Sequence, residues 1–351
     1  MPGGVTKRKD GVHIPSLYQL VERLSEHFDI TVYSLTTFEP LATESSCGNA
    51  RVKILRAHYR DRWSKKLLRY ISSVYVDHRK ERYELLHGML GLNAELATRV
   101  LGKLLKVPTI VSLLGGETAK LPAINYGTLA HPLLNIPMRW VCKNVSCLTV
   151  QTNFQMKQLE QHGMHREEIH IIPRGVDTSK FFPNGRTPEV APPFRFLHVA
   201  NLLDVKDQVT LLKAFKVISQ SVDCRLRIIG TDYLNGKIQS LSRELGIASK
   251  VEFLEWLDHS SLREHYLWAH VLLHTSLHES LGMVVAEAAA CGTVVCGTRV
   301  GLVHDLADNR VVAVEPGDYQ SLAQKVVWLT QNRNAYFSLR ENALRWARHH
   351  N

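Results

Sequence analysis

The feature that most constrains the fold of this chain is an alternation of strand-like and helix-like segments that runs through the sequence twice. The first series has apolar strand candidates at 30–35, 108–114 and 147–152, and a helix candidate at 16–27 with apolar residues at helical spacing. Strands separated by helices pair in parallel through crossover helices. The first series therefore predicts a domain built around a parallel sheet.

A stretch rich in Pro, Gly and polar residues, 175–193, has the composition of a domain linker. Strand candidates follow it at 194–200, 224–230 and 271–276, again with helices between them. We therefore expect an α/β fold of two Rossmann-like, doubly wound domains facing a central cleft. Ligands of open parallel sheets bind beyond the carboxyl ends of the strands, so the cleft is the expected site.

The length of 351 residues agrees with two domains. We place the N-terminal domain at 1–182, the second domain at 190–332, and a C-terminal helix in 333–351. Only ten residues precede Gly11 and none of them forms an apolar run. We therefore expect the first strand of the N-terminal sheet to be missing.

The net charge of +10 indicates an anionic partner. Residues 51–82 contain eleven Lys or Arg and only three acidic residues, with aromatic residues among them. This basic segment either lies on anionic lipid headgroups or forms a solvated basic face. No nucleic-acid recognition motif accompanies it, so we expect no nucleic-acid partner.

The chain has no apolar run of transmembrane length, and its start lacks the apolar core of a signal peptide. The six cysteines show neither zinc-site nor redox-motif spacing. We expect a cytoplasmic protein with reduced thiols, associated with a membrane if the basic segment contacts lipid.

The sharpest local pattern is HESLGMVVAEAAACG at 278–292. It predicts a helix that follows a strand, with Ser280 as the N-cap. The first turn, formed by Leu281, Gly282 and Met283, would offer free N–H groups and the positive end of the helix dipole to a diphosphate.

Two carboxylates flank this predicted phosphate seat. Glu279 lies just ahead of the helix, and Glu287 follows about two turns later. The helix is apolar on nearly all sides and should be buried, and a buried carboxylate needs a partner. We predict that Glu279 and Glu287 accept hydrogen bonds from ligand hydroxyls; the alternative for Glu287 is a structural helix residue.

Three histidines, His270, His274 and His278, have the spacing of metal ligands on a helix. They fall on a strand and the loop after it, where this spacing has no such meaning, so we predict no metal site. The sequence contains neither a P-loop nor a Gly-rich dinucleotide motif, which disfavours ATP and hydride chemistry.

These patterns resemble the retaining glycosyltransferases of family 4, which have the GT-B fold. The E-x7-E element at 279–287 is preceded by IIPRGVD at 171–177, similar to the family's "IPNGVD". Residues 200–215 are similar to its "GRL…KG…L…A" element, and 291–306 to its "G.PVV…GG..E" element. The resemblance covers nearly the whole chain and is strongest over 169–330.

The resemblance implies that a sugar moves from a nucleotide-sugar, with retention, to a glycan or a lipid-linked saccharide, without a metal or other cofactor. It makes the N-terminal domain the acceptor side and 190–332 the donor domain, and implies that the final helix returns to the N-terminal domain. It assigns roles to individual residues: ribose binding to Glu287, donor-sugar binding to Glu279, phosphate binding to Lys206 and to the N–H groups of Gly282 and Met283, and loop closure to Gly11.

Several positions depart from the family pattern. Asn201 stands where the family has a phosphate-binding Arg, and Arg174 is a candidate replacement. The histidine near the reacting carbon is absent at its usual place, where Leu114-Gly115-Gly116-Glu117 stands. Glu117 there either binds donor or acceptor or is a loop carboxylate. Two other functions stay open: a sugar-nucleotide epimerase of the same fold, or a catalytically inactive nucleotide-binding or scaffold protein.

Overall fold

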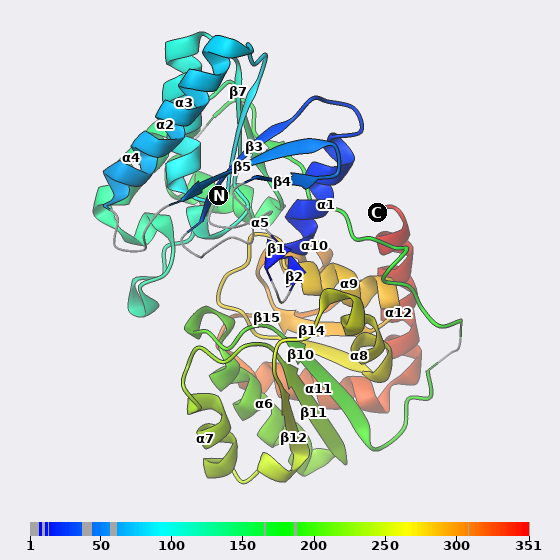
Figure 1. Cartoon of the computed structure of the whole chain (residues 1–351). Coiled ribbons are helices and arrows are strands. Elements are labelled where there is room, and N and C mark those ends of the chain that lie inside the picture. The colour runs from blue at the N-terminus through cyan, green and yellow to red at the C-terminus, as the bar shows by residue number, and fades with distance from the viewer. Residues whose placement is uncertain are drawn as a thin grey trace. The chain divides into compact units, whose positions relative to one another are not determined.

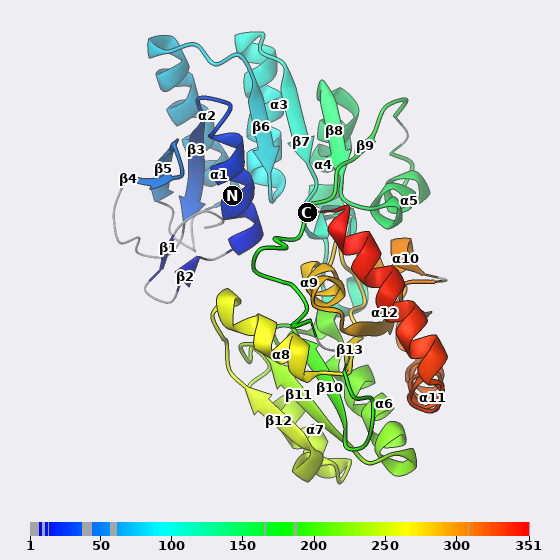
Figure 2. The ribbon, with the colours of Figure 1, turned by 90° about the vertical axis from the view of Figure 1, so that its right-hand side faces the viewer.

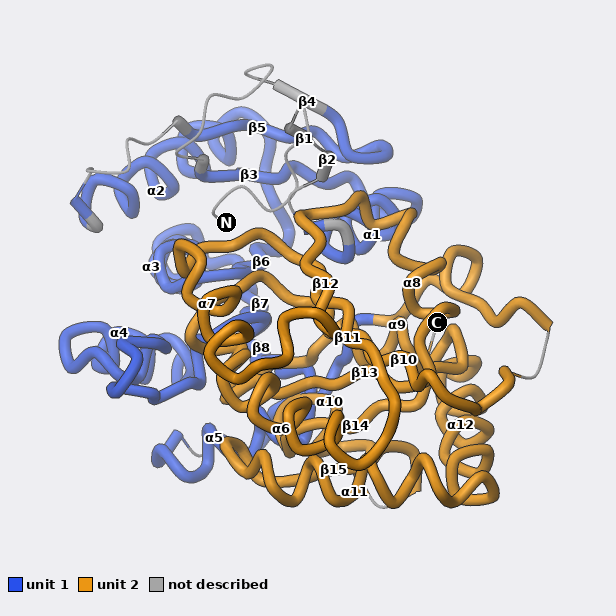
Figure 3. Tube along the Cα trace, turned by 90° about the horizontal axis from the view of Figure 1, so that it is seen from below, with its two compact units in different colours: residues 1–174 blue, residues 175–351 orange. Residues whose placement is uncertain are grey.

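The computed structural model describes residues 7–8, 11–12, 14–36, 44–56, 62–164, 166–185, 188–307 and 309–350. The chain divides into two compact units, Met1–Arg174 and Gly175–Asn351 (Figure 3). The division lies at the start of the predicted linker. The sequence-based domain boundaries at 182 and 190 stay a prediction.

The first unit contains three sheets and the helices that cover them (Figure 1). β3 pairs parallel with β5, and β4 pairs antiparallel with β5. The four strands β6, β7, β8 and β9 are parallel throughout. Its elements are β1 (Lys7–Arg8), β2 (Gly11–Val12), α1 (Pro15–Leu24), β3 (Thr31–Thr36), β4 (Glu44–Cys47), β5 (Ala50–Arg56), α2 (Trp63–Lys80), β6 (Leu86–Met89), α3 (Leu92–Leu105), β7 (Thr109–Ser112), η1 (Gly116–Thr118), η2 (Pro122–Ile124), η3 (Thr128–Ala130), α4 (Pro132–Asn144), β8 (Cys147–Val150), α5 (Asn153–Gln161) and β9 (His170–Ile171).

Ahead of α1, the described residues form only a two-residue antiparallel ladder of β1 and β2, which contains Gly11. The basic segment forms β5 and α2, and residues 57–61 lie outside the described part of the chain. Tyr70 of α2 is buried against α3 and is a core residue.

The second unit is built on one sheet of six parallel strands in the order β12-β11-β10-β13-β14-β15. Its elements are β10 (Phe194–Val199), η4 (Asp204–Lys206), α6 (Gln208–Ser221), β11 (Cys224–Ile229), α7 (Lys237–Glu244), η5 (Ala248–Lys250), β12 (Val251–Leu254), η6 (His259–Ser261), α8 (Leu262–Trp268), β13 (Val271–His274), α9 (Met283–Cys291), β14 (Val294–Thr298), α10 (Gly301–Leu306), β15 (Val312–Val314), α11 (Tyr319–Gln331) and α12 (Arg333–Arg348).

Alternation along the strands gives this sheet two apolar faces. Phe194 and Phe196 of β10 pack with α6, α7 and α11, whereas Leu197 and Val199 pack with α8, α9 and α12. Helices therefore cover both faces, as expected for a parallel sheet (Figure 2). The expected fold class, two α/β units built on parallel sheets, is confirmed.

The last helix closes the second unit. α12 packs on α9, where the guanidinium of Arg340 donates to the carbonyl of Gly292 at 3.1 Å. The N–H of Val176 donates to the carbonyl of His350 at 3.0 Å, so the start and the end of this unit meet. The expected return of this helix to the N-terminal domain stays a prediction.

Two helices differ from the sequence analysis. α9 begins at Met283 with Gly282 as N-cap, so the prediction of a Ser280 cap is wrong. α4 was not anticipated, because it contains Pro137; prolines normally end helices. No described helix is long and apolar enough to cross a membrane, and the six cysteines are free thiols.

Candidate functional site

A pocket of about 310 Å³ opens at the carboxyl ends of β10 and β11 in the second unit. It is the place where ligands of open parallel sheets bind. Five of the predicted site residues line it: Asn201, Lys206, Glu279, Gly282 and Met283. The other predicted residues of this unit, Ser280, Leu281 and Glu287, do not.

An ion pair lies in this pocket. Lys206, at the end of η4, donates to Glu279 Oε1 at 2.5 Å, and Ser276 Oγ donates to the same oxygen at 2.8 Å. Burial raises the pKa of Glu279, but Lys206, His274 and these hydrogen bonds outweigh it and lower the pKa to about 2. Glu279 is therefore a carboxylate at neutral pH, and Lys206 is held beside it as a cation.

The N-terminus of α9 supplies backbone donors to the same pocket. Gly282 has a φ of +87°, which a residue with a Cβ rarely adopts, and Met283 is the first helical residue. The N–H groups of the first helical turn have no partner within the helix and suit an anion. Leu281 is buried in the core and Ser280 is 8% exposed. Their side chains therefore pack inside the protein and do not line the pocket.

A close backbone contact fixes the loop that carries Glu279. Leu302 N–H donates to the carbonyl of Leu281 at 2.7 Å. Gly301 has a φ of +50°, and a Cβ there would lie 2.6 Å from the Leu281 carbonyl oxygen and 2.7 Å from Cβ of Glu279. Only glycine allows the start of α10 to approach the loop this closely.

Glu287 is buried and has partners within the protein. Tyr266 Oη donates to one carboxylate oxygen at 2.7 Å, and His259 Nε2 lies 2.9 Å from the other. Phe181 packs edge-on against both rings. The inference that burial alone requires a ligand at Glu287 is wrong, because α8 and η6 supply the donors. The ribose-binding role of Glu287 stays a prediction.

Asn201 has a structural contact where the family has an arginine. Its side-chain oxygen accepts a hydrogen bond from Thr231 N at 3.1 Å, which ties the loop after β10 to the loop after β11. Arg174, the candidate replacement, lies in the first unit and donates to Gln151 at 2.7 Å and Ser16 at 2.8 Å.

Glu117 lies in the first unit, in η1, and is 4% exposed. Gly115 N–H donates to its carboxylate at 2.6 Å. Burial raises the pKa of Glu117, and burial together with the neighbouring Glu117 raises that of the fully buried Glu95. The roles of Glu117 and of Gly11 in β2 stay predictions.

Sequence reasoning missed several residues of the pocket. Trp256, with a 45% exposed side chain, and Leu257 follow β12, and Gly230 follows β11. Trp256 lies two residues after the end of β12 at Leu254, in a segment without a recognised motif. His274 also lines the pocket, and burial lowers its pKa to about 4, so it is neutral at pH 7. In the described part of the chain, no cluster of three or more His, Cys, Asp or Glu could hold a metal ion.

Known structures with the same arrangement define the fold. Sucrose-phosphate synthase from Thermosynechococcus elongatus has a TM-score of 0.85 at 19% identity, over 100% of this chain and 93% of that chain. HepE from Anabaena, solved in complex with UDP-glucose, has a TM-score of 0.74 at 16% identity, over 96% and 91%. At such identities the likeness shows the fold, which is the two-unit GT-B fold.

Family comparison gives the narrower assignment. The family "Glycosyltransferase Family 4" matches residues 16–180, and "Glycosyl transferases group 1" matches residues 185–346. The two matches cover nearly all of the chain, which belongs to the family-4 glycosyltransferases, as the sequence motifs predicted.

Curated relatives match over part of their length. D-inositol 3-phosphate glycosyltransferase 2 from Catenulispora acidiphila is 30% identical over 45% of this chain and 42% of that protein. N-acetyl-alpha-D-glucosaminyl L-malate synthase from Bacillus anthracis is 24% identical over 71% and 65%. The chain thus spans about half the length of the first of these relatives and under two thirds of the second.

Proposed function

We propose that this protein transfers a sugar from a nucleotide-sugar, with retention, to a glycan or lipid-linked acceptor. The observation that supports this is one pocket in the second unit that combines the Lys206 cation, the N-terminus of α9 and the ionised Glu279. A nucleotide-sugar carries a diphosphate between two hydroxyl-bearing rings, and this set of groups matches the diphosphate and one of the rings.

The diphosphate is proposed to lie at the N-terminus of α9 beside Lys206. Backbone N–H groups and an ammonium stabilise phosphate oxygens, most strongly as charge develops on the leaving diphosphate. Glu279, a carboxylate at neutral pH, can only accept hydrogen bonds, so it suits the donor sugar hydroxyls. Trp256 offers the base a flat face, and Glu287 is proposed for the ribose.

In this mechanism the bond from the anomeric carbon to the diphosphate breaks, and the acceptor hydroxyl forms the new bond on the same face. The acceptor proton passes to the leaving diphosphate, so no protein base is required. The protein contributes positioning and stabilisation of negative charge, and no metal ion is invoked.

A lipid-linked acceptor would require the protein to reach a membrane surface. The first unit carries supporting features on two helices that both pack on α3: basic residues on α2, and on α4 Leu133 and Ile136, which are 86% and 72% exposed. Such a combination suits an anionic bilayer. We propose a cytoplasmic protein with this peripheral contact, which flotation with anionic vesicles and Leu133→Asp would test.

A second candidate is a nucleotide-binding protein without transferase activity. Asn201 favours it, because its side chain bonds Thr231 and cannot supply the missing phosphate-binding charge.

Calorimetric titration with UDP, GDP, ADP and their sugar conjugates tests the donor site. We expect one nucleotide to bind, with affinity lost about tenfold or more in Lys206→Ala and retained in Lys216→Ala, a lysine of α6 outside the pocket. Binding without sugar transfer to any acceptor or to water would favour the inactive candidate. If no nucleotide binds to protein that melts cooperatively, the proposed function is wrong.

A further inference from the structure

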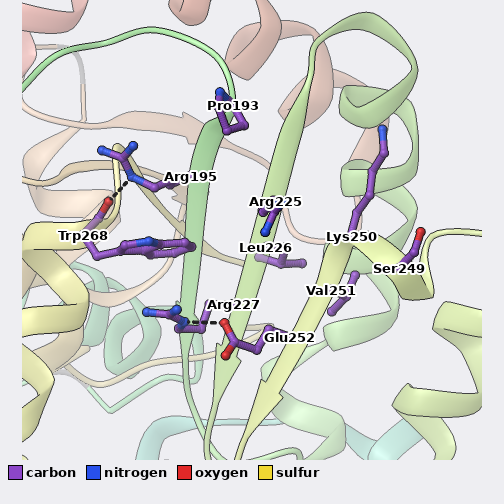
Figure 4. Close-up of a pocket in the computed structure, with 10 residues that line it drawn as sticks. All are labelled: Pro193, Arg195, Arg225, Leu226, Arg227, Ser249, Lys250, Val251, Glu252 and Trp268. Atoms are coloured by element: carbon purple, nitrogen blue, oxygen red, sulfur yellow. Dashed lines mark hydrogen bonds and ion pairs between the residues drawn. The ribbon is translucent and has the colours of Figure 1, made fainter.

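A second and larger pocket, of about 490 Å³, lies on the same sheet at the other end of the strands (Figure 4). It is lined by the amino-terminal halves of β10, β11 and β12, and by Trp268 at the end of α8. Six residues separate Arg195 in this pocket from Asn201 in the first, about 20 Å along an extended strand. The two pockets are therefore separate sites.

Charge distinguishes this second pocket, which we call the basic pocket. Its lining includes the cations Arg195, Arg225, Arg227 and Lys250, and Glu252 is its only acidic residue. The three arginines lie on the sheet face that elsewhere packs under α8, α9 and α12. Toward the edge strand β12 this face carries charge in place of apolar residues.

One arginine is neutralised and fixed. Arg227 donates to Glu252 at 2.8 Å, contacts His265 Nδ1 at 3.0 Å, and lies 4.0 Å from the ring centre of Trp268. The single carboxylate of the pocket is thus already engaged, which leaves the remaining cations without an acidic partner in the lining.

The other two arginines are direct neighbours. Arg195 and Arg225 are register partners on the parallel strands β10 and β11, so two cations enter the pocket from adjacent strands. Arg195 is oriented by its Nε, which donates to the carbonyl of Trp268 at 2.5 Å, and its two terminal amino groups remain for a ligand. Arg225 is exposed and has no carboxylate partner in the pocket.

We propose that the basic pocket binds a phosphate-bearing ligand. Arg195 and Arg225 each offer a planar pair of N–H donors that matches phosphate oxygens, and a bound anion would compensate their positive charge. Lys250 lines the same pocket, but its ammonium donates to the Ser219 carbonyl at 3.2 Å and points away from the arginines (Figure 4). The volume exceeds that of a phosphate ion, so the rest of the ligand has room beside Trp268. The ligand is a soluble phosphomonoester or a phospholipid headgroup.

The test compares Arg225→Gln with Arg243→Gln, a matched change of an exposed arginine on α7 outside the pocket. The probes are glycerol 3-phosphate, followed by calorimetry at constant ionic strength, and phosphatidylglycerol vesicles, followed by flotation. We expect Arg225→Gln to weaken binding of one probe about tenfold or more, and Arg243→Gln to leave it unchanged.

Loss of glycerol phosphate binding identifies a soluble ligand, and loss of vesicle binding alone identifies a headgroup. The melting temperature of the free Arg225→Gln protein should not fall, because Arg225 is exposed and has no acidic partner in the pocket lining, so unfolding cannot mimic the result. Equal binding of both probes by Arg225→Gln and wild type would overturn the proposal. Failure of nucleotide binding at the first pocket would not contradict the proposal for the basic pocket, because the two sites share no lining residue.

Discussion

At the scale of single residues, the pocket at the ends of β10 and β11 contains a partly buried ion pair. Lys206 and Glu279 have side chains 23% and 13% exposed, so neither charge is well solvated. Removing one partner of such a pair costs more than the pair itself contributes, because the remaining charge loses its compensation.

We therefore expect Lys206→Ala to lower the free energy of unfolding by about 1–3 kcal/mol at pH 7. Urea denaturation measures this, with Lys216→Ala as the control. The double variant with Glu279→Gln should recover part of the loss, and a strictly additive double variant would show that the pair is not coupled.

The hydroxyl of Tyr266 provides a second residue-scale test, because it is fully buried and bonds Glu287. Tyr266→Phe keeps the ring and removes one donor from a buried carboxylate, which should cost about 1–3 kcal/mol in urea denaturation. Tyr319→Phe, at the start of α11, is the control. A loss no larger than that of the control would mean that Glu287 is held by other contacts.

At the scale of elements, the start of α10 determines where Glu279 lies. Gly301→Ala would place a methyl group 2.6 Å from the Leu281 carbonyl oxygen, so the loop 279–281 must move. Gly317 also has a positive φ, of +82°, but no atom lies within 4 Å of an added Cβ. Gly317→Ala therefore measures the free-energy cost of a Cβ at positive φ without any steric contact.

We expect Gly317→Ala to lower the free energy of unfolding by about 1–2 kcal/mol through backbone strain alone. Gly301→Ala should lose more than this and also weaken nucleotide binding, which thermal melting and calorimetry measure. Equal losses with intact binding would show that the loop adapts without moving Glu279.

The same elements show what the sequence could and could not predict. Lys206, Glu279, Gly282 and Met283 were identified because each follows a strand in a short, recognisable motif, and the sheet brings those strand ends together. The start of α9 was misplaced because a serine favours the N-cap, whereas the backbone turns at Gly282. Trp256 was missed because the end of β12 carries no turn signal.

The partners of Glu287 and the basic pocket were beyond sequence reasoning for a different reason. Arg195, Arg225 and Arg227 become neighbours only through the register of two parallel strands, which the local sequence does not encode. Tyr266 and His259 reach Glu287 from 21 and 28 residues away. Such contacts depend on tertiary packing, which hydrophobic periodicity along the sequence does not report.

At the scale of the molecule, stability should depend on pH through buried histidines. Burial lowers the pKa of His198, His274 and His278 to about 4 in the folded state, against about 6.5 when unfolded. Between these values the unfolded chain binds more protons, so the free energy of unfolding rises with pH and is lost as pH falls from 6.5 toward 4.

The expected slope is about 1.4 kcal/mol per pH unit for each histidine. Glu279, whose folded pKa is about 2, extends the loss into the range from its unfolded value of about 4.3 down to 2. Denaturant melts across pH 3–7 measure both effects, and Glu279→Gln should remove only the lower one. Constant stability between pH 6.5 and 4 would contradict the burial of neutral histidines.

The hydrogen bond from Val176 to the carbonyl of His350 has an evolutionary consequence. The described start and end of the second unit therefore lie side by side, an arrangement that allows a domain to be exchanged or circularly permuted. Recombination at 174/175 would exchange the pocket at the ends of β10 and β11 together with the basic pocket, without cutting the sheet between them. Chimeras joined at 174/175 should therefore keep the second unit folded, and circular permutants opened in an exposed loop should fold as well.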